Sequence, residues 1–251
     1  KLSGKIDLIK FKKKNLSLIE VDSILFGLAG FLYDLRYQDH YIYELKTNWQ
    51  KLRTELNIEI MDRSEWNFFR LRPPNFPTLR IAFSSGLLHE ILYDELLKDI
   101  INIFENGTNV KKELMHRFND IHISDYWKKH YNFGKVTANE INIIGKERIT
   151  DIIVNVLLPL TYLYSEFFER NNLKNRIEYL YKKEKQKSSS NEVIRVMEKQ
   201  IDIKVNTLSD EQGLIQLHNY YCIKGKCSEC EIGKTVFSNE KVNEPLKIIL
   251  Y

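Results

Sequence analysis

Apolar residues recur every three or four positions along most of this chain, which is the spacing of one face of an α-helix. The 251 residues include ten Gly and five Pro. These numbers are low for the length, and a scarcity of turn residues favours helices over a turn-rich β-architecture. The pattern therefore predicts an all-α fold, a multi-helix bundle with a Cys-rich loop near the C-terminus.

The predicted helices cover most of the sequence, and we expect one helical domain over residues 1–251. The first, Leu18–Leu35, is apolar nearly all round and is expected to be buried. The segment 182–191 is rich in Lys and Ser and is expected to be a flexible loop. The other predicted helical segments are Tyr41–Leu56, Leu87–Phe104, Val110–Phe118, Asn139–Phe168 with a kink at Pro159, Leu173–Lys185, Glu192–Ile201 and Leu208–Tyr221.

Local signals support the first helix. Ser17 precedes it and Glu20 follows three residues later, which is the pattern of a capping box. Gly27 and Gly30 share one face, where a second helix is expected to approach closely.

Composition and charge restrict the class of protein only loosely. The chain is 43% hydrophobic and 29% charged, with a formal net charge of +4, so contact with nucleic acid is allowed but not required. The most apolar run, Ile149–Tyr164, contains Pro159 and is too short to span a bilayer, so no membrane partner is expected.

The chain begins with Lys1 rather than Met, which predicts that it is the C-terminal part of a longer protein. The missing N-terminal region of the same protein would then be a natural partner. The chain as given contains no secretory signal, so we expect a cytoplasmic location.

The most distinctive segment is Gln212–Gly233, which contains all three cysteines of the chain, Cys222, Cys227 and Cys230. Their spacing is C-x4-C-x2-C, and His218 lies one helical turn before the first of them. Thiolates and imidazoles are good ligands for zinc, with three thiolates and one imidazole giving a closed tetrahedral site. The sequence thus predicts a Cys-rich metal-binding element over residues 212–233, with zinc as its metal.

Three alternatives to zinc remain open at this stage. The spacing also suits an iron–sulfur cluster, which would need a fourth ligand from elsewhere. The cysteines are otherwise free thiols acting as small buried hydrophobes, with no cofactor bound. A disulfide is less favoured because the number of cysteines is odd and no secretory signal is present.

A second distinctive segment, Trp66–Ala82, combines prolines with Arg70, Arg72 and Arg80. Pro77 suits the first turn of a helix. Three guanidiniums around a rigid loop are suited to binding a phosphate or carboxylate. Arginines also lock loops by bonding to buried acids and carbonyls, and we favour this structural role.

The segment Asp125–Gly134 mixes aromatic and basic residues. Such a mixture can stack on nucleotides, but it more often fills a helix junction, which we expect here. Lys128, Lys129 and Arg148 are candidate phosphate contacts if nucleic acid binds. The chain contains no P-loop, dinucleotide-binding, zinc-protease or serine-hydrolase motif, and we identify no catalytic residues.

Three segments together, Ile24–Leu32, Phe69–Ala82 and Gln212–Gly233, resemble the uncharacterised bacterial family DUF2851, and the likeness is to its C-terminal part. The family's members come mainly from Bacteroidetes and carry a further N-terminal region. The resemblance implies a family but no known activity.

A second resemblance concerns the order of elements. A helix entered through Gly145, followed later by His218 and the Cys loop, is similar to endonuclease III-type DNA glycosylases. The resemblance would imply a DNA-facing loop with an iron–sulfur cluster. The fourth cysteine and a match to the catalytic Asp or Lys are missing.

Two hypotheses for function follow. The first is a metal-containing helical module that contacts nucleic acid and serves a larger bacterial protein. The second is a structural or protein-interaction domain with free thiols. A glycosylase-like enzyme is the least favoured alternative.

Overall fold

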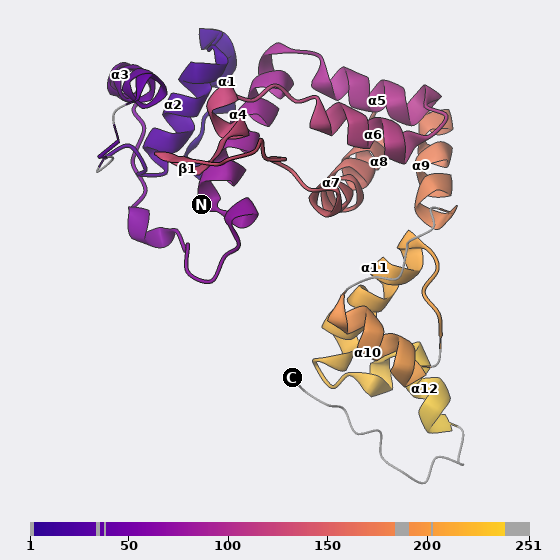
Figure 1. Cartoon of the computed structure of the whole chain (residues 1–251). Helices are drawn as coiled ribbons and strands as arrows, with labels where there is room; N and C mark the ends of the chain where they lie inside the picture. The colour runs from indigo at the N-terminus through magenta and orange to yellow at the C-terminus, as the bar shows by residue number, and fades with distance from the viewer. Residues whose placement is uncertain (1–2, 34–35, 38, 184–190, 202, 239–251) are drawn as a thin grey trace. The chain divides into compact units, whose positions relative to one another are not determined.

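The computed structural model describes residues 3–33, 36–37, 39–183, 191–201 and 203–238. It forms two compact units, residues 1–156 and 157–251 (Figure 1). The all-α, multi-helix fold is confirmed, with one short two-stranded hairpin in the described ranges. The single domain over 1–251 stays a prediction, and the loop predicted at 182–191 lies mostly outside the described residues.

The first unit is built around α2 (Leu18–Leu28), which packs against both α3 (His40–Leu56) and α4 (Pro77–Tyr93) (Figure 1). The helix begins where predicted. The carboxylate of Glu20 accepts hydrogen bonds from the backbone N–H and the hydroxyl of Ser17, each at 2.8 Å. The last eight residues of α2 are all buried, as expected of a helix that is apolar nearly all round.

Gly27, within α2, and Gly30, just after it, have different roles. A Cβ on Gly27 would lie 2.1 Å from the indole ring of Trp49 in α3, so the expected close approach of a second helix is confirmed there. Gly30 instead adopts φ +77° and turns the chain, with the carbonyl oxygen of Met61 only 2.6 Å from where its Cβ would be. The helix therefore ends at Leu28, short of the predicted Leu35.

The rest of the first unit consists of short elements. Pro77 begins α4 at the first helical position, as predicted, because the missing N–H needs no partner there. The predicted apolar stripe Leu87–Phe104 divides between α4 and the next helix. The remaining helices and single turns are η1 (Ser3–Lys5), α1 (Leu8–Lys14), η2 (Arg63–Glu65), η3 (Pro73–Asn75), α5 (Leu96–Asn106), α6 (Val110–Asn119), η4 (Asp125–Lys128) and α7 (Lys146–Ile152).

Aromatic side chains fill the junction beside α2, which confirms the structural interpretation of Asp125–Gly134. The ring of Trp127 is fully buried and stacks on Phe26 with centroids 5.1 Å apart. Phe133 contacts the same indole edge-on at 5.1 Å. It lies in the turn between β1 (His130–Asn132) and β2 (Lys135–Val136), which pair antiparallel.

The helix predicted over Asn139–Phe168 is shorter and is interrupted. It begins only at Lys146, and α7 gives way to a π-turn at Ile153–Leu157 before α8 (Leu158–Phe167). Pro159 lies in the first turn of α8 rather than at a kink within one helix. Because proline cannot donate a backbone hydrogen bond, the wider π-turn precedes it.

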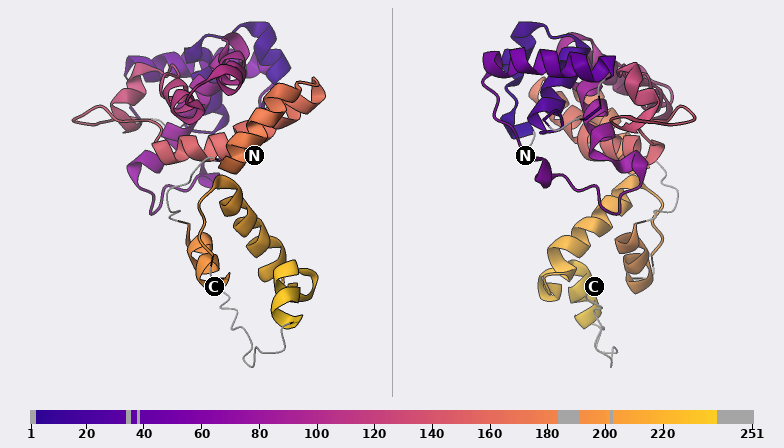
Figure 2. Two further views of the ribbon diagram at one scale, coloured as in Figure 1. Left: turned by 90° about the vertical axis from the view of Figure 1, so that its right-hand side faces the viewer. Right: turned by 60° about the vertical axis from the view of Figure 1, so that its left-hand side comes forward.

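In the second unit, α8 packs against α9 (Asn171–Lys183), and α10 (Glu192–Ile201) packs against α11 (Leu208–Leu217). Ile194, Met197 and Leu214 form a small buried cluster between the last two. Figure 2 shows α11 continuing into the turn that carries the first cysteine. The remaining elements of this unit are the π-turn η6 (His218–Cys222), η7 (Cys227–Glu229) and α12 (Glu231–Ser238).

No helix among the described residues is long and apolar enough to cross a membrane.

Candidate functional site

The arginine-bearing loop before α4 is anchored by aromatic contacts. The indole N–H of Trp66 donates to the carbonyl of Ala29 at 2.9 Å. The ring of Phe68 meets Phe31 edge-on at 5.8 Å and Phe76 at 5.4 Å. These contacts fix the loop against the chain that follows α2, so the loop is ordered as the prolines predict.

The three arginines of this segment are all exposed, on the loop and on the first turn of α4. Arg70 has φ +59°, a left-handed conformation that is unusual for a residue with a side chain. Its guanidinium lies 5.0 Å from the ring of Phe69, which is 73% exposed. In the described part of the chain, neither an acid nor a carbonyl pairs with Arg70, Arg72 or Arg80. The favoured locking role is therefore not supported, and the guanidiniums face solvent.

The other basic candidates are separate from this loop along the chain and are differently engaged. Lys128 is paired with Asp125 at 2.6 Å, and Arg148 is 3.3 Å from Asp151. Lys129 is exposed. Two of these three cations thus already have carboxylate partners, which weakens them as phosphate contacts.

The three cysteines lie on one tight loop in the second unit. Cys222 ends η6, Cys227 begins η7, and Cys230 directly precedes α12. Gly225 adopts φ +64°, and its N–H donates to the carbonyl of Cys222 at 3.1 Å. A Cβ on Gly233 would lie 2.1 Å from the carbonyl oxygen of Cys227, so this glycine lets the loop close.

All three thiols are free, so the structure contains no disulfide between them. Burial raises the pKa of Cys222, and the nearby Cys230 and Cys227 raise it further because thiolate charges repel.

The fourth predicted ligand is half-buried at the start of η6. The Nδ1 atom of His218 lies 3.2 Å from the amide oxygen of Asn219, which leaves Nε2 for another partner. Within the described ranges, no three His, Cys, Asp or Glu side chains already lie where they could together hold a metal ion.

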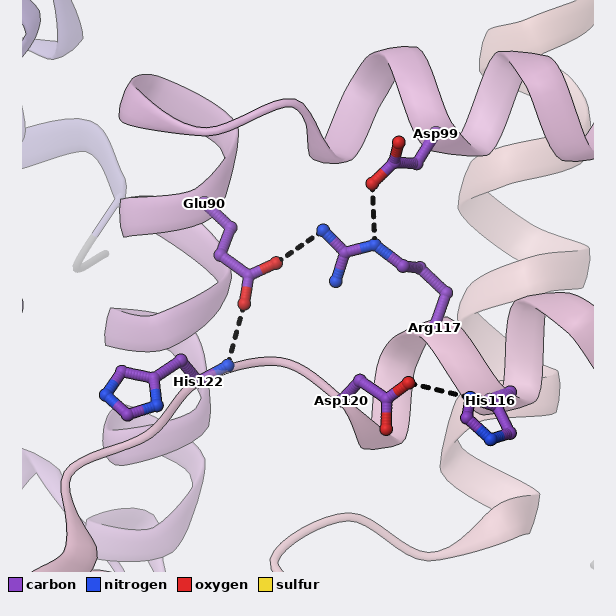
Figure 3. Close-up of polar contacts among 6 residues, drawn as sticks. All are labelled: Glu90, Asp99, His116, Arg117, Asp120 and His122. Carbon is purple, nitrogen blue, oxygen red and sulfur yellow. Dashed lines mark hydrogen bonds and ion pairs between the residues drawn. The ribbon is translucent and has the colours of Figure 1, made fainter.

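An ion-pair network centred on Arg117 was not found from the sequence. Figure 3 shows the guanidinium of Arg117, on α6, between Glu90 of α4 and Asp99 of α5. Its two ion pairs measure 2.7 Å and 2.9 Å. The other oxygen of the Glu90 carboxylate accepts the backbone N–H of His122 at 2.7 Å. The network ties three helices and one loop together.

The chemistry of this network is structural. The pair of His116 with Asp120, 2.7 Å apart, is largely exposed at the end of α6 (Figure 3). No contact drawn in Figure 3 joins this pair to the Arg117 network. The only sequence signal for Arg117 is a cation on a short amphipathic helix, which does not reveal its partners.

A second missed feature is Asp22, a fully buried carboxyl in the middle of α2. Its Oδ2 accepts the hydroxyls of Tyr41, at 2.8 Å, and of Ser124. The indole N–H of Trp127 donates to the same Tyr41 hydroxyl at 2.9 Å. Oδ1 is buried and has no hydrogen-bond partner among the described residues. A carboxyl in the middle of a helix that is apolar nearly all round was the signal available in the sequence.

Burial raises the pKa of Asp22 to about 6, although the nearby hydroxyls of Ser124, Tyr41 and Ser85 act in the opposite direction. Desolvation and the neighbouring Asp22 charge together raise the pKa of Tyr41 well above its usual value. The group is a closed polar contact inside the core and has no route to a substrate.

The fold and these features define an all-α protein with an exposed arginine loop and a separate thiol-rich loop. The chain belongs to the family described as "Protein of unknown function (DUF2851)", whose model matches residues 1–191. The match ends before Gln212–Gly233, so the Cys segment lies outside it. Searches of the curated proteins and of the solved structures found no match.

Proposed function

We propose that this chain is a helical module that contacts nucleic acid through the exposed arginine loop. The observation that carries the proposal is that Arg70, Arg72 and Arg80 are exposed without acidic partners in the described part of the chain. A guanidinium binds phosphate oxygens through two parallel hydrogen bonds. The exposed ring of Phe69 beside Arg70 adds a surface on which a base can stack.

The anchoring of the loop also supports this function. Because aromatic contacts of Trp66 and Phe68 hold the backbone, little conformational entropy is lost when a ligand binds. The paired cations Lys128 and Arg148 would have to give up carboxylate partners first. We therefore expect them, and Lys129, to contribute less than the arginine loop.

The test is fluorescence anisotropy with labelled single-stranded DNA and RNA over a range of salt concentrations. Affinity should fall steeply with salt because bound phosphates release counterions. The variant R70A/R72A/R80A should bind more weakly and lower the slope of log K against log salt by about 0.7 for each lost contact. K128A serves as a matched control on an already paired cation.

Absence of binding by the full chain at low ionic strength would overturn this proposal. The alternative, a structural or protein-interaction domain with free thiols, would then be favoured. Equal losses in K128A and in the arginine variant would show that the contact is diffuse rather than centred on the loop.

We further propose that Cys222, Cys227 and Cys230 bind zinc, with Nε2 of His218 as the fourth ligand. The tight turn at Gly225 and the effect of Cys230 and Cys227 on the pKa of Cys222 support this proposal. Zinc replaces the thiol protons and removes the repulsion between thiolates, so it would draw the four groups into a tetrahedron. An iron–sulfur cluster is the alternative metal centre.

Elemental analysis of purified protein distinguishes the outcomes. One zinc per chain that is lost in C227S/C230S supports the site, and iron with sulfide supports the alternative. Protein without either metal, even after zinc is added, would exclude the site and favour free thiols.

A further inference from the structure

Two adjoining hollows lie along the exposed side of α3 in the first unit. The first, about 500 Å³, is lined by side chains that include Tyr33, Lys46, Trp49 and Arg53. The second, about 540 Å³, includes Tyr43 and shares Lys46 with the first. Volumes of this size suit small organic ligands. Lys46 therefore stands between two successive compartments.

Contacts of Trp49 and Arg53 shape the first hollow. Trp49 forms its floor and is only 5% exposed, because its ring is pressed against Gly27 of α2. Arg53 donates from Nη1 to the hydroxyl of Tyr33 at 2.8 Å, which holds both side chains at the rim. No carboxylate is among the described side chains that line this hollow, while Lys46 and Arg53 are both cationic. Its chemistry is aromatic and positively charged.

The second hollow continues the same character. Tyr37 and Tyr43 are 46% and 69% exposed, so each presents much of its ring to solvent. A Cβ on Gly134 would lie 2.2 Å from the ring of Tyr37, so this ring packs tightly on the β-hairpin. Among the described side chains that line this hollow, the carboxylate is that of Asp39, which already caps α3 by accepting the N–H of Ile42 at 2.8 Å.

We propose that this groove, defined by Tyr33, Tyr37, Tyr43, Lys46 and Arg53, binds two consecutive nucleotides of a single-stranded nucleic acid. The tyrosine rings supply stacking surfaces for two bases, which are sequence-tolerant because every base has a π-face. Lys46, between the hollows, contacts the phosphate that links the two nucleotides. Arg53 contacts the next phosphate at the rim.

The segment that lines the first hollow also contacts the arginine loop. Phe31 directly precedes Leu32 and Tyr33, and its ring contacts Trp66 and Phe68 of that loop. This inference rests on the proposed function, which it deepens by naming where the bases lie.

Tyr43→Ala and Lys46→Ala in the full chain test the groove. Both side chains are at the surface of α3, and we expect each variant to fold. Affinity for labelled oligouridine and oligothymidine should drop about fivefold or more in Tyr43→Ala. Lys46→Ala should also lower the salt slope by about 0.7. The matched controls are Tyr179→Ala, whose ring is 63% exposed in the other unit, and Lys51→Ala, an exposed cation of α3.

The outcomes separate the groove from the wider proposal. If the parent chain binds, R70A/R72A/R80A weakens binding, and the groove variants match their controls, then the groove assignment is wrong and the proposed function stands. If the parent chain binds neither oligonucleotide at low salt, both are wrong. A preference for oligouridine over oligothymidine would identify RNA as the source of the strand.

Discussion

At the scale of single residues, Asp22 shows which of two opposing effects controls a buried carboxyl. Two hydroxyls donate to it, which favours its charged form, yet desolvation is larger and raises its pKa to about 6 from 3.8. Between about pH 4 and pH 6, the Asp22 carboxyl is therefore mostly protonated in the native state and mostly ionised in the unfolded state. Stability from this group is full below the lower value and is lost as pH rises through the higher one.

Asp22→Asn should remove this pH dependence. An amide keeps an acceptor for the hydroxyls of Tyr41 and Ser124 and cannot ionise. Urea unfolding at pH 8 should show the variant more stable than the parent by up to about 3 kcal/mol, the equivalent of the pKa shift. Near pH 4 most of the advantage should disappear, because the native parent is then protonated and its unfolded state is about half protonated.

The parent chain is its own control in this experiment, since only the difference between the two pH values is interpreted. Parallel stability curves for the parent and Asp22→Asn from pH 4 to pH 8 would contradict a raised native pKa.

The sequence predicts some single-residue roles better than others. The capping box of Ser17 and Glu20 and the close approach at Gly27 follow from local spacing alone. The turn at Gly30 depends on Met61, which is distant in the sequence. Local sequence patterns therefore predict contacts within an element, whereas contacts between distant residues require the three-dimensional structure.

At the scale of elements, helical periodicity located most helices, but it could not show how they end. The apolar pattern continues past Leu28 and through Ile153–Leu157, yet the chain turns at one place and widens into a π-turn at the other. The turn at Gly30 lies against the distant residue Met61, whereas the π-turn precedes Pro159, which lacks a backbone N–H. The Arg117 network is similar, because its acids come from two other helices.

Arg117→Ala should loosen the contact of α6 with α4 and α5. Glu90 is only 7% exposed and would lose its cationic partner, while Asp99 is 44% exposed and is partly screened by water. We expect the free energy of unfolding to fall by about 1.5–3 kcal/mol, the range for hydrogen bonds to charged groups. Arg195→Ala, which removes an exposed pair with Glu192, should change it much less, because water screens that pair.

Thermal and urea denaturation measure the stability of both variants. Equal, small effects of Arg117→Ala and Arg195→Ala would mean that solvent replaces the Glu90 contact at little cost. The network would then be a surface feature rather than a lock between helices.

At the scale of the whole molecule, the division into two compact units was not visible in the sequence. The chain passes from α7 to α8 through helical turns, so no Gly- or Pro-rich linker marks the boundary at Val156. The candidate sites follow this division: the arginine loop and the α3 groove lie in the first unit and the cysteines in the second. The sequence identified the arginines and cysteines by type, while the groove depends on how α2 and α3 pack.

This division predicts that zinc acts on only one unit. Metal bound by Cys222, Cys227 and Cys230 would add its binding energy to the local structure of residues 212–233. In hydrogen–deuterium exchange, adding a chelator to zinc-loaded protein should speed exchange in η6, η7 and α11. The exchange of α2 and α3 should stay unchanged, since their stability comes from apolar packing such as that of Trp49 on Gly27.

The C227S/C230S variant should already show the faster exchange without chelator and should not respond to it. Chelation that accelerates exchange throughout residues 1–156 would show instead that the metal supports the fold of the whole chain.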